Sequence, residues 1–141
     1  MTIRIAAITA LMLGSVVSAH AQDFRSPAPA GVKLYFIEPK DGAEIAGPVT
    51  VKMGLVGMGV APAGVEKKDT GHHHIFIDEK LTDLMAPMPA DDKHRHFGAG
   101  QTETVLTLQP GKHTLQLVLG DHNHIPHNPA VTSELITVTV K

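Results

Sequence analysis

The sequence predicts an all-β domain, an antiparallel sandwich of two sheets of the immunoglobulin-like type. Runs rich in β-branched and apolar residues alternate with glycine and proline turns, and no long segment has a convincing helical period. Six such runs fall within about 110 residues, which is the size of an immunoglobulin-like sandwich. The chain has no cysteine or tryptophan, so it cannot have the Cys–Trp–Cys core of a true immunoglobulin domain. A small open barrel is the competing architecture.

The start of the chain, residues 1–21, is predicted to be an export signal. Arg4 precedes an apolar run from Ile5 to Val17, and Ala19-His20-Ala21 has the small-x-small pattern of a cleavage site. We expect cleavage after Ala21; cleavage after Ala19 is the alternative, and it would leave His20 to chelate copper with its own amine. The apolar run is too short to span a bilayer comfortably and no later segment is apolar enough. The protein is therefore expected to be periplasmic or secreted, with no membrane span.

Composition limits the partners and the chemistry. Loss of Arg4 with the signal leaves 11 of the 12 basic residues against 14 acidic ones, a net charge of −3, so we expect no nucleic-acid partner. Without cysteine there is no disulfide, no thiolate nucleophile and no blue-copper centre. Nine of the 10 histidines remain after residue 21, and any metal must be held by imidazole, carboxylate or thioether. The oligomeric state stays open.

The domain is predicted to span residues 32–141, after a proline- and alanine-rich segment at 22–31 that reads as a flexible tether. Its first strand is expected at Val32–Ile37, which Pro39 and the turn at Asp41-Gly42 terminate. A second strand is expected at Pro48–Val56, where alternate apolar residues share one face. Those residues are Val49, Val51, Met53 and Leu55.

The later strands are bounded by turn residues. A glycine-rich loop at 57–71 leads to a third strand at His72–Ile77, and Lys80–Gly100 is expected to be irregular. Glu103–Leu108 and His113–Leu119 flank a Pro110-Gly111 turn and predict a hairpin. The last strand is expected at Ser133–Lys141.

Three histidine pairs share one spacing, with a single residue between the two rings. In extended backbone such residues lie on one face, roughly 6.5–7 Å apart, and their rings can converge on one ion. The third pair lies in a loop, Asp121–Pro129, that two prolines make rigid. The pairs are His72 and His74, His94 and His96, and His122 and His124, and the loop adds His127.

Strand directions are expected to bring these pairs to one rim of the sandwich. The strand before the Pro110-Gly111 turn begins, and the strand after it ends, at the same end of the domain. If His72–Ile77 pairs antiparallel with His113–Leu119, its first residues lie at that end as well. We therefore predict a metal site at this rim, where loops on a rigid scaffold commonly carry binding residues. Its predicted ligands are His72, His74, His94, His96, His122, His124 and His127.

Other polar and thioether groups are predicted to support the site or to be alternative ligands. Asp121 could bind the ion, orient a ligand ring or satisfy loop amides. His113 shares the parity of the leucines in its strand, so it could orient a ring or be a hydrogen-bonded core-edge residue. His73 shares the core parity of Ile75 and Ile77 and is expected to be a hydrogen-bonded core-edge residue. Thioether sulphur suits copper(I), so Met58, Met85 and Met88 are alternative ligands, whereas Met53 has core parity.

Three segments resemble a family of short exported bacterial domains known only as a domain of unknown function. They read GHHHIFID at 71–78, HFGAGQTE at 96–103 and GKHTLQLVLGDHNHIPHNP at 111–129. The resemblance covers most of residues 71–141 and implies export and a β-rich fold, with no established activity. Size, export and His/Met content also make the chain similar to periplasmic copper-resistance sandwiches, by analogy alone.

These observations predict a periplasmic metal-binding protein, a carrier or buffer for copper or zinc, and no enzymatic activity. Imidazole ligation suits copper(II), zinc or nickel, and the Irving–Williams order places copper first. Binding should weaken as pH falls through about 6.5, because a ligand imidazole must be neutral. The alternatives are a small zinc enzyme with an open fourth position and a non-catalytic module that binds another envelope protein or a glycan.

Overall fold

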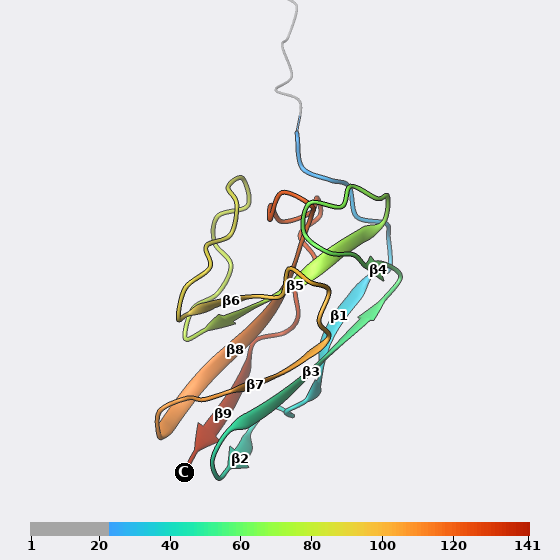
Figure 1. Cartoon of the computed structure of the whole chain (residues 1–141). Coiled ribbons are helices and arrows are strands. Elements are labelled where there is room, and N and C mark those ends of the chain that lie inside the picture. The colour runs from blue at the N-terminus through green and yellow to red at the C-terminus, as the bar shows by residue number, and fades with distance from the viewer. Residues whose placement is uncertain (1–22) are drawn as a thin grey trace, which may run out of the picture.

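The computed structural model describes residues 23–141 as an all-β fold, with strands and no helix in that part of the chain (Figure 1). The strands are β1 Lys33–Glu38, β2 Ala43–Ile45, β3 Val49–Val56, β4 Gly59–Val60, β5 Thr70–Ile77, β6 His94–His96, β7 Glu103–Leu106, β8 Gly111–Gly120 and β9 Ile136–Val140. The predicted signal and both predicted cleavage positions lie outside the described residues. Within residues 23–141, no helix is long and apolar enough to cross a membrane.

The strands form two sheets, which confirms the predicted two-sheet sandwich. The smaller sheet is antiparallel, in the order β1-β3-β7. The larger has the order β2-β9-β8-β5, with β4 and β6 paired to the edge of β5 away from β8. Its β2–β9 and β4–β5 pairs are parallel, so this sheet is mixed rather than purely antiparallel. The immunoglobulin-like strand arrangement is not confirmed.

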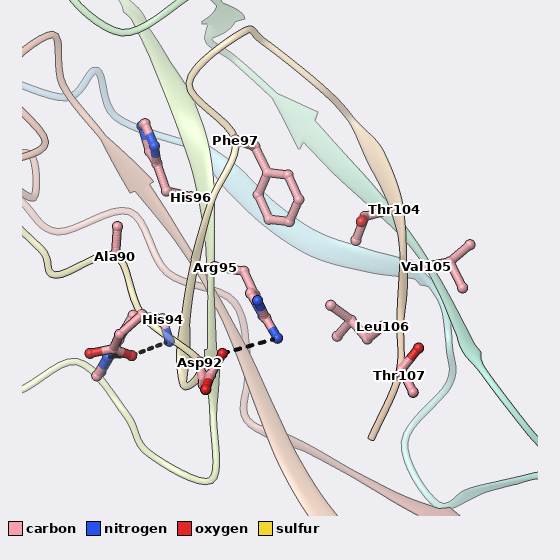
Figure 2. A pocket seen from close by; sticks show the side chains of 11 residues that line it. Ala90, Asp92, His94, Arg95, His96, Phe97, Thr104, Val105, Leu106 and Thr107 are labelled. Atoms are coloured by element: carbon pink, nitrogen blue, oxygen red, sulfur yellow. Dashed lines mark hydrogen bonds and ion pairs between the residues drawn. The ribbon is translucent and has the colours of Figure 1, made fainter. Parts of the chain in front are cut away.

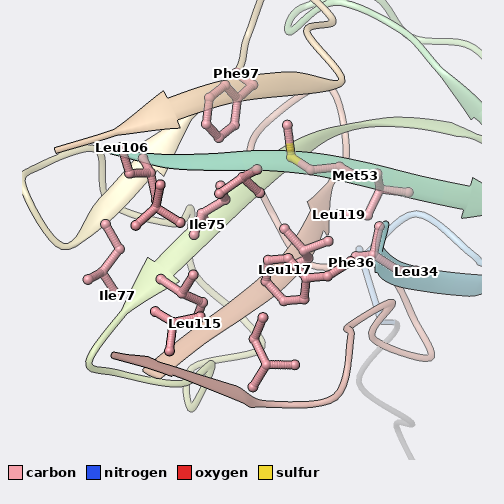
Figure 3. Packing of buried hydrophobic residues seen from close by; sticks show 14 of the residues in the cluster. Leu34, Phe36, Met53, Ile75, Ile77, Phe97, Leu106, Leu115, Leu117 and Leu119 are labelled. Atoms are coloured by element: carbon pink, nitrogen blue, oxygen red, sulfur yellow. The ribbon is translucent and has the colours of Figure 1, made fainter. Parts of the chain in front are cut away.

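The main core lies between the sheets and follows from strand alternation. Val49, Val51 and Met53 of β3 face inward as predicted, and β8 contributes leucines from the opposite sheet (Figure 3). Side chains of this size contribute about 1.5–3 kcal/mol each when fully buried. The β8 leucines are Leu115, Leu117 and Leu119, all fully buried. This core fixes β5 and β8, the two central strands on which the site is built.

The predicted hairpin between Glu103–Leu108 and His113–Leu119 is wrong. β7 pairs with β3 in the smaller sheet, whereas β8 lies between β5 and β9 in the larger one. The turn at Pro110 therefore joins two sheets. Consecutive residues 117–120 of β8 are all buried, which is the pattern of a central strand with both faces covered. The chain still reverses at this turn, so β7 begins and β8 ends at the same end of the domain (Figure 1).

The sequence also missed three short strands. β2 and β4 lie in segments read as turn and loop, and β6 lies in the stretch expected to be irregular. β6 has no apolar alternation, and it exists because the edge of β5 offers unpaired backbone groups to His94–His96. Strand pairing of this kind is decided by a neighbour far away in sequence.

Part of the predicted tether lies against the domain. Asn128 donates its backbone N–H to the carbonyl of Ser26 and accepts from the N–H of Ala28, each at 2.9 Å. The Ser26 hydroxyl also donates to the Asp121 carboxylate at 2.8 Å. Residues 26–28 therefore run beside the 121–129 loop, at the end of the domain that carries the histidines (Figure 1).

Candidate metal centre

Alternation along β5 places successive histidines on opposite faces of the larger sheet. His73, Ile75 and Ile77 face the core, so His72 and His74 face outward. β6 runs beside β5 with His96 directly opposite His74, and the loop after β8 supplies His124. One ligand nitrogen from each of four rings, His72, His74, His96 and His124, lies within 4.8 Å of the other three. We call these residues the histidine cluster.

The shortest separations within the cluster meet at one atom. Nε2 of His72 lies 3.0 Å from Nε2 of His74 and 3.0 Å from Nδ1 of His124. The His96 ring centroid lies 5.0 Å from those of His72 and His74 and 4.7 Å from that of His124. The four rings therefore surround a common point rather than forming a row.

Hydrogen bonding alone does not satisfy this arrangement. A neutral imidazole has one N–H donor and one acceptor nitrogen. Nε2 of His72 has either a single proton or a single lone pair, so it cannot make good hydrogen bonds to the ring nitrogens of His74 and His124 at the same time. The Nδ1 atoms of His72 and His74 are buried and have no partner among the described residues. Buried polar atoms left in this state are uncommon and point to a strained or functional site.

Burial keeps the inner rings neutral. His72 and His74 are buried, and burial together with the nearby His rings lowers the pKa of His72 to about 4 and that of His74 to about 2. Burial and the proximity of the His124 ring also lower the pKa of His96. Neutral imidazole is the form that coordinates a metal, so at neutral pH these rings need no deprotonation before binding.

The loop that carries His124 is held by one carboxylate. Asp121 Oδ1 accepts the backbone N–H groups of Asn123 at 2.8 Å and Ile125 at 3.0 Å, and Oδ2 accepts the Ser26 hydroxyl. Burial opposes ionisation of Asp121, but these hydrogen bonds outweigh it and lower its pKa. His124 itself has φ 65°, a left-handed conformation that costs a histidine free energy. The loop is therefore fixed in the shape that directs His124 inward.

Two glycines leave space for the ligand rings. A Cβ atom on Gly120, which is paired with His72 across the strands, would lie 2.9 Å from Nε2 of His74. A Cβ atom on Gly98 would lie 2.7 Å from Nε2 of His96. Any side chain at either position would push a ring away from its present place. Sequence reasoning overlooked both glycines, because each contact depends on a strand or loop that comes near only in the fold.

Three of the seven predicted ligands lie apart from the histidine cluster. Nδ1 of His94 contacts Asp91 at 2.8 Å and its Nε2 contacts Glu79 at 3.1 Å. Nε2 of His122 accepts from Asn123. His127 is buried, with its ring nitrogens 3.2 Å from the carbonyl oxygen of Thr70 and 3.3 Å from that of Leu119. The structure thus brings together both histidines of the first predicted pair, His72 and His74. It adds only His96 from the second pair and only His124 from the third.

The two residues expected to support a ligand ring have other partners. Asp121 satisfies loop amides, which was one of its three predicted roles. His113 lies near the start of β8, where it contacts Asp78 at 2.8 Å and the carbonyl of Gln109 at 2.8 Å. That position is at the end of β8 remote from Gly120, so His113 is not in contact with the histidine cluster. His73 faces the core, as its parity with Ile75 and Ile77 predicted, but the predicted hydrogen bond is wrong: it is fully buried and neither ring nitrogen has a partner among the described residues.

A cavity of about 630 Å³ opens between the edge strands β6 and β7 of the two sheets. Figure 2 shows Arg95 and Phe97 on the side of β6 that faces this cavity, with the His96 ring on the opposite side. Arg95 lies 3.8 Å from Asp92. His96 of the histidine cluster is also among the residues that line this cavity, although its ring lies on the side of β6 away from Arg95 and Phe97.

The fold and site define an all-β, two-sheet domain with four convergent histidines on the outer face of the larger sheet. The chain belongs to the family described as Domain of unknown function (DUF4399), whose model matches residues 51–141. This confirms the resemblance seen in the sequence, and the matched range contains the whole histidine cluster.

Other comparisons add no activity. No curated protein matches the chain. Among solved structures, the X-ray structure of the endo-beta-1,4-mannanase from Thermotoga petrophila is similar over 78% of this chain, at 19% identity and a TM-score of 0.45. The chain spans only about a fifth of that enzyme, 20% of its length. A likeness of this size says nothing about the fold or the activity of this chain.

Proposed function

We propose that this protein is an exported metal carrier or buffer that binds one copper or zinc ion through the histidine cluster. The observation that carries the proposal is the pair of 3.0 Å contacts at Nε2 of His72, within a group of four ligand nitrogens no more than 4.8 Å apart. A cation at their centre would satisfy all four lone pairs at once, which no arrangement of ring protons achieves.

The separations suit a first-row metal. With metal–nitrogen bonds of about 2.0–2.1 Å, neighbouring ligands lie about 3.3 Å apart in a tetrahedron and about 2.9 Å apart in a square plane. The two contacts of 3.0 Å lie between these values. His96 and His124 are partly exposed, so their side chains can rotate to close the longer distances. Copper(II) is expected to bind more tightly than zinc, following the Irving–Williams order.

Four imidazoles favour carriage over catalysis. A catalytic zinc ion keeps one position open for water, whereas a four-coordinate site is closed. The carboxylate closest in sequence to His124, Asp121, is engaged by loop amides and by Ser26, so it is not available as a general base. Export is supported by Arg4, the following apolar run and the Ala19-His20-Ala21 pattern; a periplasmic location is part of this proposal.

Metal titration of the purified, chelator-stripped protein tests the proposal. We expect one copper(II) or one zinc ion per chain at pH 7.5, with weaker binding at pH 5. His96→Ala and His124→Ala should each weaken binding at least about 100-fold, because each removes a ligand. Isothermal calorimetry with a competing chelator measures both affinities. Absence of binding at pH 7.5 would overturn the proposal.

Matched controls come from the same strand and the same loop. His94→Ala and His122→Ala each remove an imidazole two residues from a cluster member, and both residues lie apart from the cluster. These variants should bind metal within about threefold of the parent protein. Equal losses in all four variants would instead indicate non-specific binding by surface histidines.

A further inference from the structure

A small apolar cluster covers one flank of the site. Phe76, Met88 and Val118 are buried together on the outer face of the larger sheet, with Leu81 packed against them. Val118 is paired with His74 across β5 and β8, so this apolar group begins next to a cluster histidine. His96, which lies on the side of β5 away from β8, and His124 are partly exposed. The site therefore has one dry side and one side open to solvent.

Met88 is the member of this group that reaches the ligands. The point where a Gly120 Cβ would stand lies 2.8 Å from Cε of Met88 and 2.9 Å from Nε2 of His74. The methyl end of Met88 and a ligand nitrogen thus share the space above Gly120. Because Cε is the terminal atom, rotation about the Cγ–Sδ bond can move the methyl group aside and expose the sulphur lone pairs.

The backbone fixes Met88 in this place. Its N–H donates to the carbonyl oxygen of His124 at 2.9 Å, so Met88 is tied to a second cluster residue through a different atom. Figure 1 shows the long connection between β5 and β6 running back toward the 121–129 loop. The hydrogen bond between Met88 and His124 joins this connection to that loop. Met85 of the same connection is 49% exposed, and Met53 lies in the core between the sheets.

We propose that Met88 supplies a thioether ligand to the metal at the histidine cluster, so that the site holds copper(I) as well as copper(II). This inference rests on the proposed function and deepens it, since it assigns copper rather than zinc as the cargo. Thioether sulphur is a soft ligand that selects copper(I), whereas imidazole accepts zinc and both copper states. A methionine packed on one dry flank would add affinity for copper(I) and little for zinc.

Met88→Leu tests the assignment, because leucine keeps a similar volume in the apolar cluster and removes the sulphur. Copper(I) affinity is measured without oxygen by competition with a chromogenic copper(I) chelator, and zinc affinity is measured on the same samples. We expect copper(I) binding to weaken at least tenfold and zinc binding to stay within threefold. Met85→Leu, in the same connection but exposed, should leave both affinities unchanged.

X-ray absorption at the copper edge gives a second measurement that does not depend on how the variant folds. The copper(I)-loaded parent protein should show a sulphur scatterer beside the nitrogen shell, and Met85→Leu should retain it. A nitrogen-only shell, or equal copper(I) affinity in Met88→Leu, would overturn the role of Met88 while leaving the histidine site intact. If the parent protein bound neither copper nor zinc, the proposed function would be overturned as well.

Discussion

Nε2 of His72 is the atom at which the closest contacts of the histidine cluster meet. It faces two other ring nitrogens at 3.0 Å, while its own Nδ1 is buried without a partner among the described residues. The approach of the ring nitrogens costs free energy in the metal-free protein, and a cation bound among them would remove that cost. Nδ1 of His72 would remain without a partner, because it lies on the other side of the ring. Metal affinity should therefore depend on how closely the rings can approach one another and on their protonation.

Gly120→Ala should weaken metal binding without removing a ligand. Its Cβ would lie 2.9 Å from Nε2 of His74, closer than a real side chain tolerates, so the ring must move. We expect copper(II) affinity to fall at least tenfold while the far-ultraviolet circular dichroism spectrum stays that of the parent protein. Gly47→Ala, at a turn with no atom within 4 Å of the added carbon, is the control for strain alone. An unchanged affinity in Gly120→Ala would show that the site does not use His74.

The pH dependence of metal affinity should have two parts. Burial lowers the pKa of His72 to about 4 and that of His74 to about 2, so neither ring competes for protons at pH 5. The fall in log Kd for zinc with each unit of rising pH should therefore be less than two near pH 5, and it should become larger below about pH 4. Chelator competition between pH 4 and 7.5 measures this slope. A fall of about four in log Kd per pH unit at pH 5 would contradict the buried positions of these two rings.

At the scale of elements, the three consecutive histidines of β5 lie on both faces of the larger sheet. The outward pair belongs to the cluster, and the inward His73 lies in the core. β6 then adds His96 from one side, and the 121–129 loop adds His124 from the end of β8. Because the period of a strand is two, a shift of one residue in the β5 register would send His72 and His74 into the core and destroy the site.

Asp121→Ala should loosen the loop and reduce metal affinity, although Asp121 is outside the cluster. The variant removes an acceptor for the amides of Asn123 and Ile125 and for the Ser26 hydroxyl. We expect a loss of about 2–3 kcal/mol in the free energy of unfolding, since charged hydrogen bonds are removed. Urea unfolding measures stability, and zinc titration measures affinity. Asp121→Asn retains one acceptor oxygen and should lie between the parent protein and Asp121→Ala; the reverse order would refute this role.

At the scale of the whole molecule, the two-sheet core holds a group of neutral histidines that acid must charge. Burial lowers the pKa values of His72 and His73 to about 4 and, with the neighbouring rings, that of His74 to about 2. Between about pH 6.5 and pH 4 the unfolded chain therefore binds more protons than the folded one, and stability falls as pH falls. His113 has the opposite effect on the pH dependence of stability, because hydrogen bonding to Asp78 raises its pKa. Its contribution is smaller than that of the buried histidines, because Asp78 is exposed to solvent.

The metal-free protein should thus have a lower urea midpoint at pH 4.5 than at pH 7. His73→Leu should raise the midpoint at pH 7, because two unpartnered buried nitrogens are replaced by carbon, and it should reduce the acid-induced drop. His122→Ala, in the loop, is expected to change neither. Urea titrations followed by circular dichroism at both pH values provide the measurement. An acid-induced drop as large in His73→Leu as in the parent would refute the contribution of His73.

Much of the fold could be predicted because strand periodicity is local. The β3 alternation and the outward and inward faces of β5 follow from residue order alone. The hairpin prediction was wrong because a turn fixes only that the chain reverses, and not whether the next strand joins the same sheet. The three short strands were missed for a related reason, since they are stabilised by partners distant in sequence rather than by their own pattern.

By itself, the sequence determined the all-β class, the absence of thiol chemistry and the surplus of histidines that pointed to a metal. The tertiary structure decided which histidines converge: His96 and not His94, His124 and not His122. It also decided that Gly98, Gly120 and Met88 border the site. The physical reason is that a side chain's direction follows from its local backbone, whereas its neighbours depend on which strands pair and where the loops lie between them.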